Sequence, residues 1–174
     1  RKTHTMLKFG KNSIVVNSFS KFFCMPGWRL GWCIVPFNLT ESFLKLSQNL
    51  FISSSNVGQF SAIKVFDCMK ELKVIVNNYK LGRDRAIESL SKIKKIKFLK
   101  PHGAFYFYLN IKELEISSLK LVRNILNDTG IALTPGIDFD KKNGEGYIRM
   151  SFSNDHQITK EASELLLNWF KKNY

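Results

Sequence analysis

Four residues between positions 18 and 29 combine an amine with groups that can bind an anion. Lys21 follows an expected short strand, Ser18 and Ser20 stand just before it, and Arg29 comes eight residues later, after a Pro26-Gly27 turn. Hydroxyls, loop N–H groups and a guanidinium can together hold a dianionic phosphate. A lysine ammonium beside another cation loses its proton more readily, so its neutral amine can attack a carbonyl. The segment predicts a phosphate site next to a reactive amine.

The complete string from Ser18 to Trp32 is far more specific than the spacing of its charges. A lysine and an arginine eight residues apart also occur in ordinary serine-rich surface turns. The string, however, resembles the S-x-S-K-x-x-x-x-x-G-W-R-x-G-[YW] signature of class I/II aminotransferases, members of the fold-type I pyridoxal-phosphate superfamily. Pyridoxal phosphate carries an aldehyde that an amine can trap and a phosphate that needs an anion site. The segment offers both.

Further segments resemble landmarks of the same family and occur in the family's order. Residues 59–62 resemble part of the long helix that follows the lysine segment. Residues 101–106 resemble its P-x-G-A-F-Y element. Residues 135–139 and 146–152 resemble its closing P-G-x-x-F and G-x-x-R-[LI]-[SC]-[FY] elements. The resemblance therefore covers essentially the whole chain, but only the C-terminal half of a full-length family member.

The resemblance implies a role for five residues. Lys21 matches the lysine that forms the Schiff base with pyridoxal 5'-phosphate and moves a proton during the reaction. Ser18, Ser20 and Arg29 match groups that bind the cofactor's phosphate. Arg149 matches the arginine that binds the substrate's α-carboxylate, where a bidentate guanidinium fixes orientation as well as charge. By itself, Arg149 would read as an ordinary arginine on a strand.

The reaction implied by the resemblance is transamination. An amino acid gives its amino group to the cofactor, and a 2-oxo acid then takes it. An aspartate or broad-specificity aminotransferase is expected, working as a cytoplasmic homodimer with no metal, nucleic-acid or membrane partner. Two alternatives stay open: a β-lyase or synthase on the same fold, and a non-catalytic module of a regulator that binds the cofactor.

The chain departs from the family pattern in two respects. Asp140 stands where many relatives have glycine. In the family, the groups that bind the cofactor ring, including the aspartate at its pyridine nitrogen, lie upstream of the lysine, and twenty residues precede Lys21 here. We therefore expect the chain to hold only part of the active site and to be inactive alone.

The elements that must position these residues alternate between strands and helices, which predicts an α/β fold. Residues 1–74 are expected to be the remainder of the fold-type I large cofactor domain, and residues 75–174 the small α/β C-terminal domain. Strands are expected at residues 13–17, 30–35, 103–109, 131–134 and 147–152. Helices are expected at 40–50 with Thr40 as the cap, at 57–76, onward to 91, and from 117 or 118 to 128. A last helix is expected from 155 or 159 to the end, with Ala162, Leu165, Leu166, Trp169 and Phe170 on its apolar side. Apolar residues interleave with lysines at 92–100, as on a half-buried strand and its lead-in.

The net charge and the cysteines limit which other partners and which thiol chemistry are expected. The net charge is +13, and all of the excess lies in the first hundred residues, which hold 18 Lys and Arg against 5 Asp and Glu. Such a surface can bind nucleic acid, but a solvated face or one that meets an acidic segment is favoured because no nucleic-acid motif accompanies the charge. The three cysteines form no CxxC pair, so reduced thiols are expected.

Overall fold

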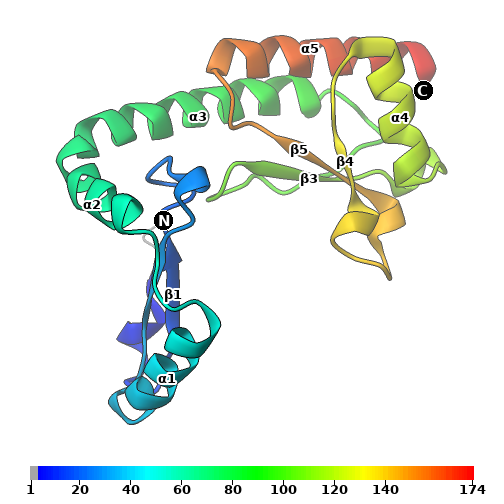
Figure 1. Cartoon of the computed structure of the whole chain (residues 1–174). Coiled ribbons are helices and arrows are strands. Elements are labelled where there is room, and N and C mark those ends of the chain that lie inside the picture. Colours follow the sequence, from blue (N-terminus) through cyan, green and yellow to red (C-terminus); the bar gives the residue numbers. More distant parts are fainter. Residues whose placement is uncertain (1–3) are drawn as a thin grey trace. The chain divides into compact units, whose positions relative to one another are not determined.

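The computed structural model describes residues 4–174, and the chain divides into two compact units, Arg1–Val74 and Ile75–Tyr174 (Figure 1). Helix α3 (Met69–Leu90) runs through the boundary between them. Within the described part of the chain, no helix has the length and apolar character needed to cross a membrane. Cys24, Cys33 and Cys68 are exposed and form no disulfide.

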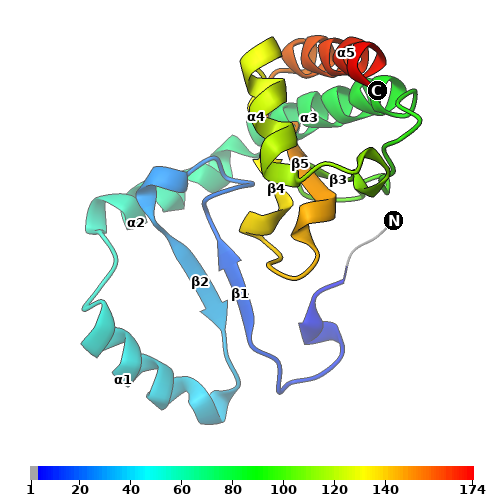
Figure 2. The same cartoon turned by 90° about the vertical axis from the view of Figure 1, so that its right-hand side faces the viewer.

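The first unit is built on a two-stranded antiparallel pair, β1 (Val15–Ser18) with β2 (Gly31–Ile34), which Figure 2 shows side by side. Short 3-10 turns flank the strands: η1 (Met6–Lys8), η2 (Pro26–Trp28) and η3 (Phe37–Leu39). Helices α1 (Thr40–Leu50) and α2 (Asn56–Lys64) follow, and η4 (Val65–Cys68) joins α2 to α3. The unit therefore has one hairpin-like pair and few layers to bury apolar side chains.

The core of the first unit is small, and many of its apolar side chains are uncovered. Met25, Leu30 and Ala62 are buried together. Helix α1 buries none of its residues, and Phe37 is 96% exposed. Further apolar side chains of this unit that are more than half exposed are Met6, Phe9, Val16, Leu44, Leu46, Leu50, Phe51, Ile52, Val57, Phe60, Ile63, Phe66 and Val74. Taken alone, the unit leaves much more apolar surface in water than a stable domain usually does.

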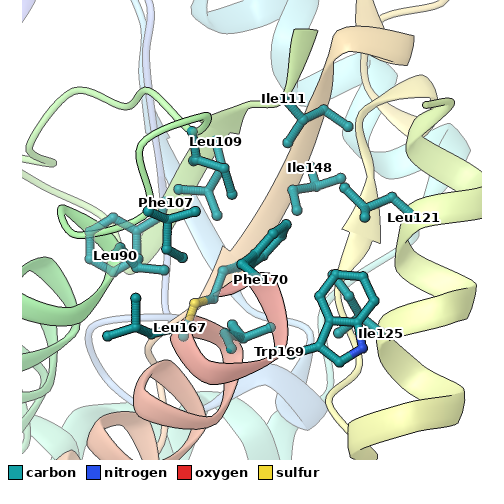
Figure 3. Close-up of a cluster of buried hydrophobic side chains, with 14 of the residues drawn as sticks. Leu90, Phe107, Leu109, Ile111, Leu121, Ile125, Ile148, Leu167, Trp169 and Phe170 are labelled. Atoms are coloured by element: carbon teal, nitrogen blue, oxygen red, sulfur yellow. The ribbon is translucent and has the colours of Figure 1, made fainter. Parts of the chain in front are cut away.

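The second unit is a three-stranded antiparallel sheet covered on one face by helices. The strand order is β3 (Tyr106–Asn110), β5 (Tyr147–Ser151), β4 (Thr134–Pro135). Helices α3, α4 (Ser118–Thr129) and α5 (His156–Asn173) pack on one side of it. Side chains of β3 and β5 alternate, so that one set joins the helices in the core (Figure 3). The buried set is Phe107, Leu109, Ile148 and Met150 from the sheet with Leu90, Leu121, Ile125, Leu166, Leu167, Trp169 and Phe170 from the helices.

The ends of α4 and α5 are fixed by the caps that the sequence predicts. The Ser117 hydroxyl accepts a hydrogen bond from the Lys120 N–H, and Gly130 ends α4 with φ of 73°. The Asp155 carboxylate accepts a hydrogen bond from the Gln157 N–H at 2.8 Å, so Asp155 is the N-cap of α5. The Trp169 indole donates to Asp128 at 2.7 Å and ties α5 to α4. These helix boundaries were predictable because caps are local interactions.

Other expected elements differ in the structure. The single helix expected over residues 57–76 is interrupted by η4, in which Phe66 contacts the rings of Phe19 and Phe23. The strand expected over 103–109 begins only at Tyr106, and the strand expected over 131–134 is reduced to Thr134–Pro135. In each case tertiary contacts rather than the local pattern decide where the element begins or ends.

Three finer expectations are also corrected. The lysine-rich stretch 92–100, expected to lead into a half-buried strand, forms turns with one isolated bridge between Lys97 and Asn110. Thr40 is the first residue of α1 and not its cap. On α5 the sequence assigned Leu165 to the apolar face, but Leu165 is 45% exposed and Leu167 is 8% exposed. Leu165 and Leu167 have the same hydropathy, so only the packing determines which of them is buried.

The loop between β4 and β5 is closed by two glycines and one carboxylate. The Asp140 carboxylate accepts hydrogen bonds from the N–H groups of Lys142 and Asn143 at 2.8 and 3.0 Å. These bonds, that of Asn143 first, lower the pKa of the Asp140 carboxyl. They therefore stabilise the loop above the ordinary pKa of the carboxyl and are lost as the pH falls through the lowered value. The Asp140 backbone lies outside the left-handed region, so glycine is not needed there.

Replacing Gly144 by alanine tests how tightly this loop is closed. A Cβ at Gly144 would overlap the backbone of Gly136, and neither backbone can move without breaking the turn. We expect Gly144→Ala to lower the free energy of unfolding by about 2 kcal/mol or more, measured by urea denaturation. Gly103→Ala is the control, because its added methyl meets nothing within 4 Å. Equal stability of the two variants would contradict the tight closure.

Candidate functional site

The Lys21 segment is a loop that leaves β1 and returns as β2, and backbone hydrogen bonds close it. The Phe19 N–H donates to the Leu30 carbonyl at 3.1 Å, next to the last strand pair. The Met25 N–H donates to the Phe19 carbonyl at 3.2 Å, and the Cys24 N–H donates to the Lys21 carbonyl at 3.0 Å. Lys21 thus lies in a tight turn whose backbone is held at both ends.

Aromatic side chains hold this loop against the helices of the first unit. Phe19 lies 5.0 Å from Phe23 and 5.0 Å from Trp32 between ring centroids, and Phe23 lies 5.4 Å from Phe66 of η4. Met25 and Leu30 are buried beside these rings. Phe19, Met25 and Leu30 therefore face inward. Ser18, Lys21 and Arg29 are exposed.

The polar groups of the loop are arranged as an anion site requires. The Ser18 hydroxyl donates to the Ser20 hydroxyl at 2.9 Å and accepts from the Ser20 N–H at 3.0 Å. Arg29 has a left-handed backbone, with φ of 52°, and its Nη1 donates to the Pro26 carbonyl at 2.8 Å. Its remaining N–H groups have no acceptor among the described residues and can serve an anion. An arginine with a left-handed backbone conformation is strained, and such strain often marks a functional loop.

Glycine at position 31 is required by the approach of the two strands. An added Cβ would lie 2.6 Å from the Asn17 carbonyl oxygen, closer than any real side chain allows. Ser18 pairs with Gly31 in the strand register, so Arg29 stands two residues from the partner of Ser18. The strand pair therefore brings Ser18, Ser20, Lys21 and Arg29 to one loop region. These groups fit a phosphate-bearing aldehyde because they include a hydroxyl pair, a guanidinium and an amine.

Arg149 lies in the second unit, on the face of β5 that points away from the helices. Its Cζ lies 4.4 Å from the centroid of the Tyr106 ring and 4.5 Å from that of Phe139. Its Nη2 donates to the Thr134 hydroxyl at 3.2 Å. Its Nε is buried and has no hydrogen-bond partner among the described residues. A desolvated, permanently charged guanidinium with unused donors is suited to bind an anion.

Sequence reasoning missed the three residues that surround Arg149. Tyr106 and Phe139 ended two of the family-like segments, but nothing in the spacing brings them to Arg149. Thr134 was expected only as part of a strand, and the register of β4 with β5 sets it opposite Arg149. The pairing of distant strands is a tertiary property, so a single sequence could not report it.

Comparison with known proteins places these features in a family. Residues 2–165 match the model of the aminotransferase class I and II family. The chain is 34% identical to a valine–pyruvate aminotransferase of Mycobacterium tuberculosis, over 91% of the chain and 42% of that protein. It is 34% identical to a (5-formylfuran-3-yl)methyl phosphate transaminase of Methanocaldococcus jannaschii, over 98% of the chain and 46% of that protein.

Solved structures that resemble this chain are also aminotransferases, as the sequence relatives are. An aminotransferase from Mycobacterium tuberculosis superimposes with a TM-score of 0.93 at 32% identity, covering 98% of this chain and 45% of that one. A structure described as an aminotransferase from Silicibacter pomeroyi gives a TM-score of 0.94 at 34% identity, covering 99% and 46%. The expected fold-type I α/β architecture is confirmed. The chain spans somewhat less than half the length of these relatives. It belongs to the class I and II aminotransferases.

Proposed function

We propose that the chain is the C-terminal part of an aminotransferase that uses pyridoxal 5'-phosphate to move an amino group from an amino acid to a 2-oxo acid. The Lys21 loop carries the proposal, because it joins an amine to phosphate-binding groups in a chain of this family. Residues 1–74 belong to the large cofactor domain and residues 75–174 form the small domain. The division into two compact units at Val74 supports this assignment.

The residues of the Lys21 loop have distinct tasks in this proposal. When bound, pyridoxal phosphate supplies an aldehyde and a ring that stabilises negative charge at the substrate's α-carbon. Lys21 holds the cofactor covalently and moves the proton at that carbon. Ser18, Ser20 and Arg29 bind the phosphate, and the Arg29 donors that no described residue uses support this role. The closed backbone of the loop keeps these groups in place before the cofactor arrives.

Arg149 binds the α-carboxylate shared by the amino acid and the 2-oxo acid. Its charge and its unpaired Nε support this role, because a buried N–H without an acceptor favours an incoming anion. The named relatives include a valine–pyruvate aminotransferase and an aspartate aminotransferase of Sulfolobus acidocaldarius, the latter 31% identical over 86% of this chain. The α-carboxylate is the feature that such different amino acids have in common.

The intact enzyme is proposed to act as a homodimer in the cytoplasm. The family resemblance supports this assignment. The exposed apolar side chains of the first unit, such as Phe37 and Ile52, also need further protein to cover them. That covering would come from the other half of the enzyme and from the dimer partner.

Covalent trapping tests the role of Lys21. Borohydride reduction of the intact, cofactor-loaded enzyme, followed by peptide mapping, should place a pyridoxyl adduct on Lys21, because that amine lies in the same loop as the proposed phosphate-binding groups. Lys21→Ala should abolish turnover while part of the phosphate binding persists. Lys45→Ala, which removes a lysine paired with Glu41 on α1, is the control and should keep the adduct. An adduct on another lysine would refute the assignment.

Replacement of Arg149 by lysine tests carboxylate binding. Lysine keeps the charge but loses the bidentate fork, so kcat/KM of the intact enzyme should fall about a hundredfold, roughly 3 kcal/mol. Cofactor affinity should change little. Arg123→Lys on the exposed side of α4 is the control and should leave kcat/KM near the wild-type value. If Arg149→Lys weakened cofactor binding as much as it weakened turnover, Arg149 would belong to the phosphate site instead.

The 174-residue chain alone should neither transaminate nor bind the cofactor tightly. It holds an amine and part of a phosphate site, whereas the expected ring-binding groups lie outside it. Its uncovered apolar side chains favour aggregation. Residues 75–174, which hold their own core, should unfold cooperatively when produced separately. Incubation of the chain with pyridoxal phosphate, aspartate and 2-oxoglutarate is the assay, and steady turnover by a monodisperse sample would overturn this expectation.

A further inference from the structure

Two aromatic rings lie against the Arg149 guanidinium. We call Tyr106 and Phe139 the aromatic clamp, because their ring centroids lie 4.4 and 4.5 Å from the Arg149 Cζ. A cation is attracted to the negative face of an aromatic ring, so the clamp holds the guanidinium in a defined plane. Hydrogen bonds can then be made only at the edge of that plane, where the N–H groups point.

The clamp residues stand on elements whose backbones are held by strand pairing or hydrogen bonds, and Phe139 is 54% exposed. Tyr106 is the first residue of β3, and its ring packs against Phe105 with centroids 4.4 Å apart. Phe139 lies in the loop closed by Gly136 and Gly144, and its N–H donates to the Gly136 carbonyl at 3.0 Å. The backbone of each residue is therefore held by its own element, whether or not a ligand is bound.

The N–H groups at the edge of the guanidinium are also held in position for a ligand. The Thr134 hydroxyl accepts from Nη2 at 3.2 Å and sets the rotation of the group within its plane. Nε is buried and unpaired among the described residues, so water competes little for this side of the arginine. A ligand that lies in the guanidinium plane can add hydrogen bonds without displacing a ring.

We propose that Tyr106 and Phe139 are positioning residues that make Arg149 select planar carboxylates over tetrahedral anions of equal charge. A carboxylate matches the guanidinium fork within one plane. A tetrahedral phosphinate places one carbon on each side of the plane of its two oxygens, and a carbon directed at either ring of the clamp meets steric resistance. The selectivity concerns the α-carboxylate and therefore rests on the function proposed above, whereas the clamp itself does not.

The geometry of the clamp can be measured without catalysis in residues 75–174, which contain Tyr106, Phe139 and Arg149 and hold their own core. In a nitrogen-15 NMR spectrum, the Nε–H signal of Arg149, identified by its loss in Arg149→Lys, should be shifted upfield by the two rings and exchange slowly with water. Phe139→Leu should reduce the shift and raise the exchange rate about tenfold, whereas Phe139→Tyr, which keeps a ring, should restore both. Tyr106→Leu should act like Phe139→Leu.

A control variant separates the clamp from general effects of losing a ring. Tyr147 lies on the same strand and face as Arg149, and its ring stacks on Tyr108 with centroids 4.8 Å apart. Tyr147→Leu should leave the Arg149 signal unchanged. A wild-type signal in both Phe139→Leu and Tyr106→Leu, with folding shown by the rest of the spectrum, would overturn the clamp.

The selectivity is measured in the intact enzyme by comparing an amino acid with its monoanionic methylphosphinate analogue. Phe139→Leu should reduce the preference for the carboxylate about tenfold and raise KM with little change in kcat, because the carboxylate is bound alike in ground and transition states. Phe139→Tyr should retain the preference. An unchanged ratio in an active Phe139→Leu enzyme would refute the selectivity. A wild-type enzyme that binds neither compound would instead refute the proposed function, and the NMR result would still report on the clamp.

Discussion

The alternation of side chains along β3 and β5 is the constraint on which the second unit depends. Phe107, Leu109, Ile148 and Met150 must face the helices to form the core. Because successive residues of a strand point to opposite faces, this requirement sends Tyr106 and Arg149 to the other face. A shift of the register by one residue would exchange the two faces, so core packing also fixes the position of the functional arginine.

A comparable dependence holds in the first unit, where a strand pair and an aromatic cluster fix the Lys21 loop. The loop's own backbone bonds would not hold it against a particular surface. Phe19, Phe23, Trp32 and Phe66 provide that attachment, and the close approach at Gly31 allows the strands to meet. The polar residues between the rings are left at the surface. Apolar residues of the signature segment thus position the loop, and its polar residues carry the chemistry.

The two units differ in how completely they bury their own apolar side chains. The second unit buries a continuous core of side chains from three helices and the sheet. Among its described residues, the first buries the apolar side chains of Met25, Leu30, Ala62 and Leu72 and leaves most of α1 and α2 in water. The chain also spans less than half of its relatives. Both facts support the proposal that the chain is the C-terminal part of a longer aminotransferase.

The sequence by itself determined the family, the types of the candidate site residues and the local signals. Lys21, Arg29 and Arg149 stand in strings long enough to be specific, and the caps of α4 and α5 are decided within a few residues. Tertiary structure alone decided the break at η4, the choice of Leu167 over Leu165 and the rings on Arg149. These features depend on contacts between residues far apart in the chain, such as Phe139 with Arg149 or Phe66 with Phe19. A local pattern carries no information about which distant side chain will complete such a contact.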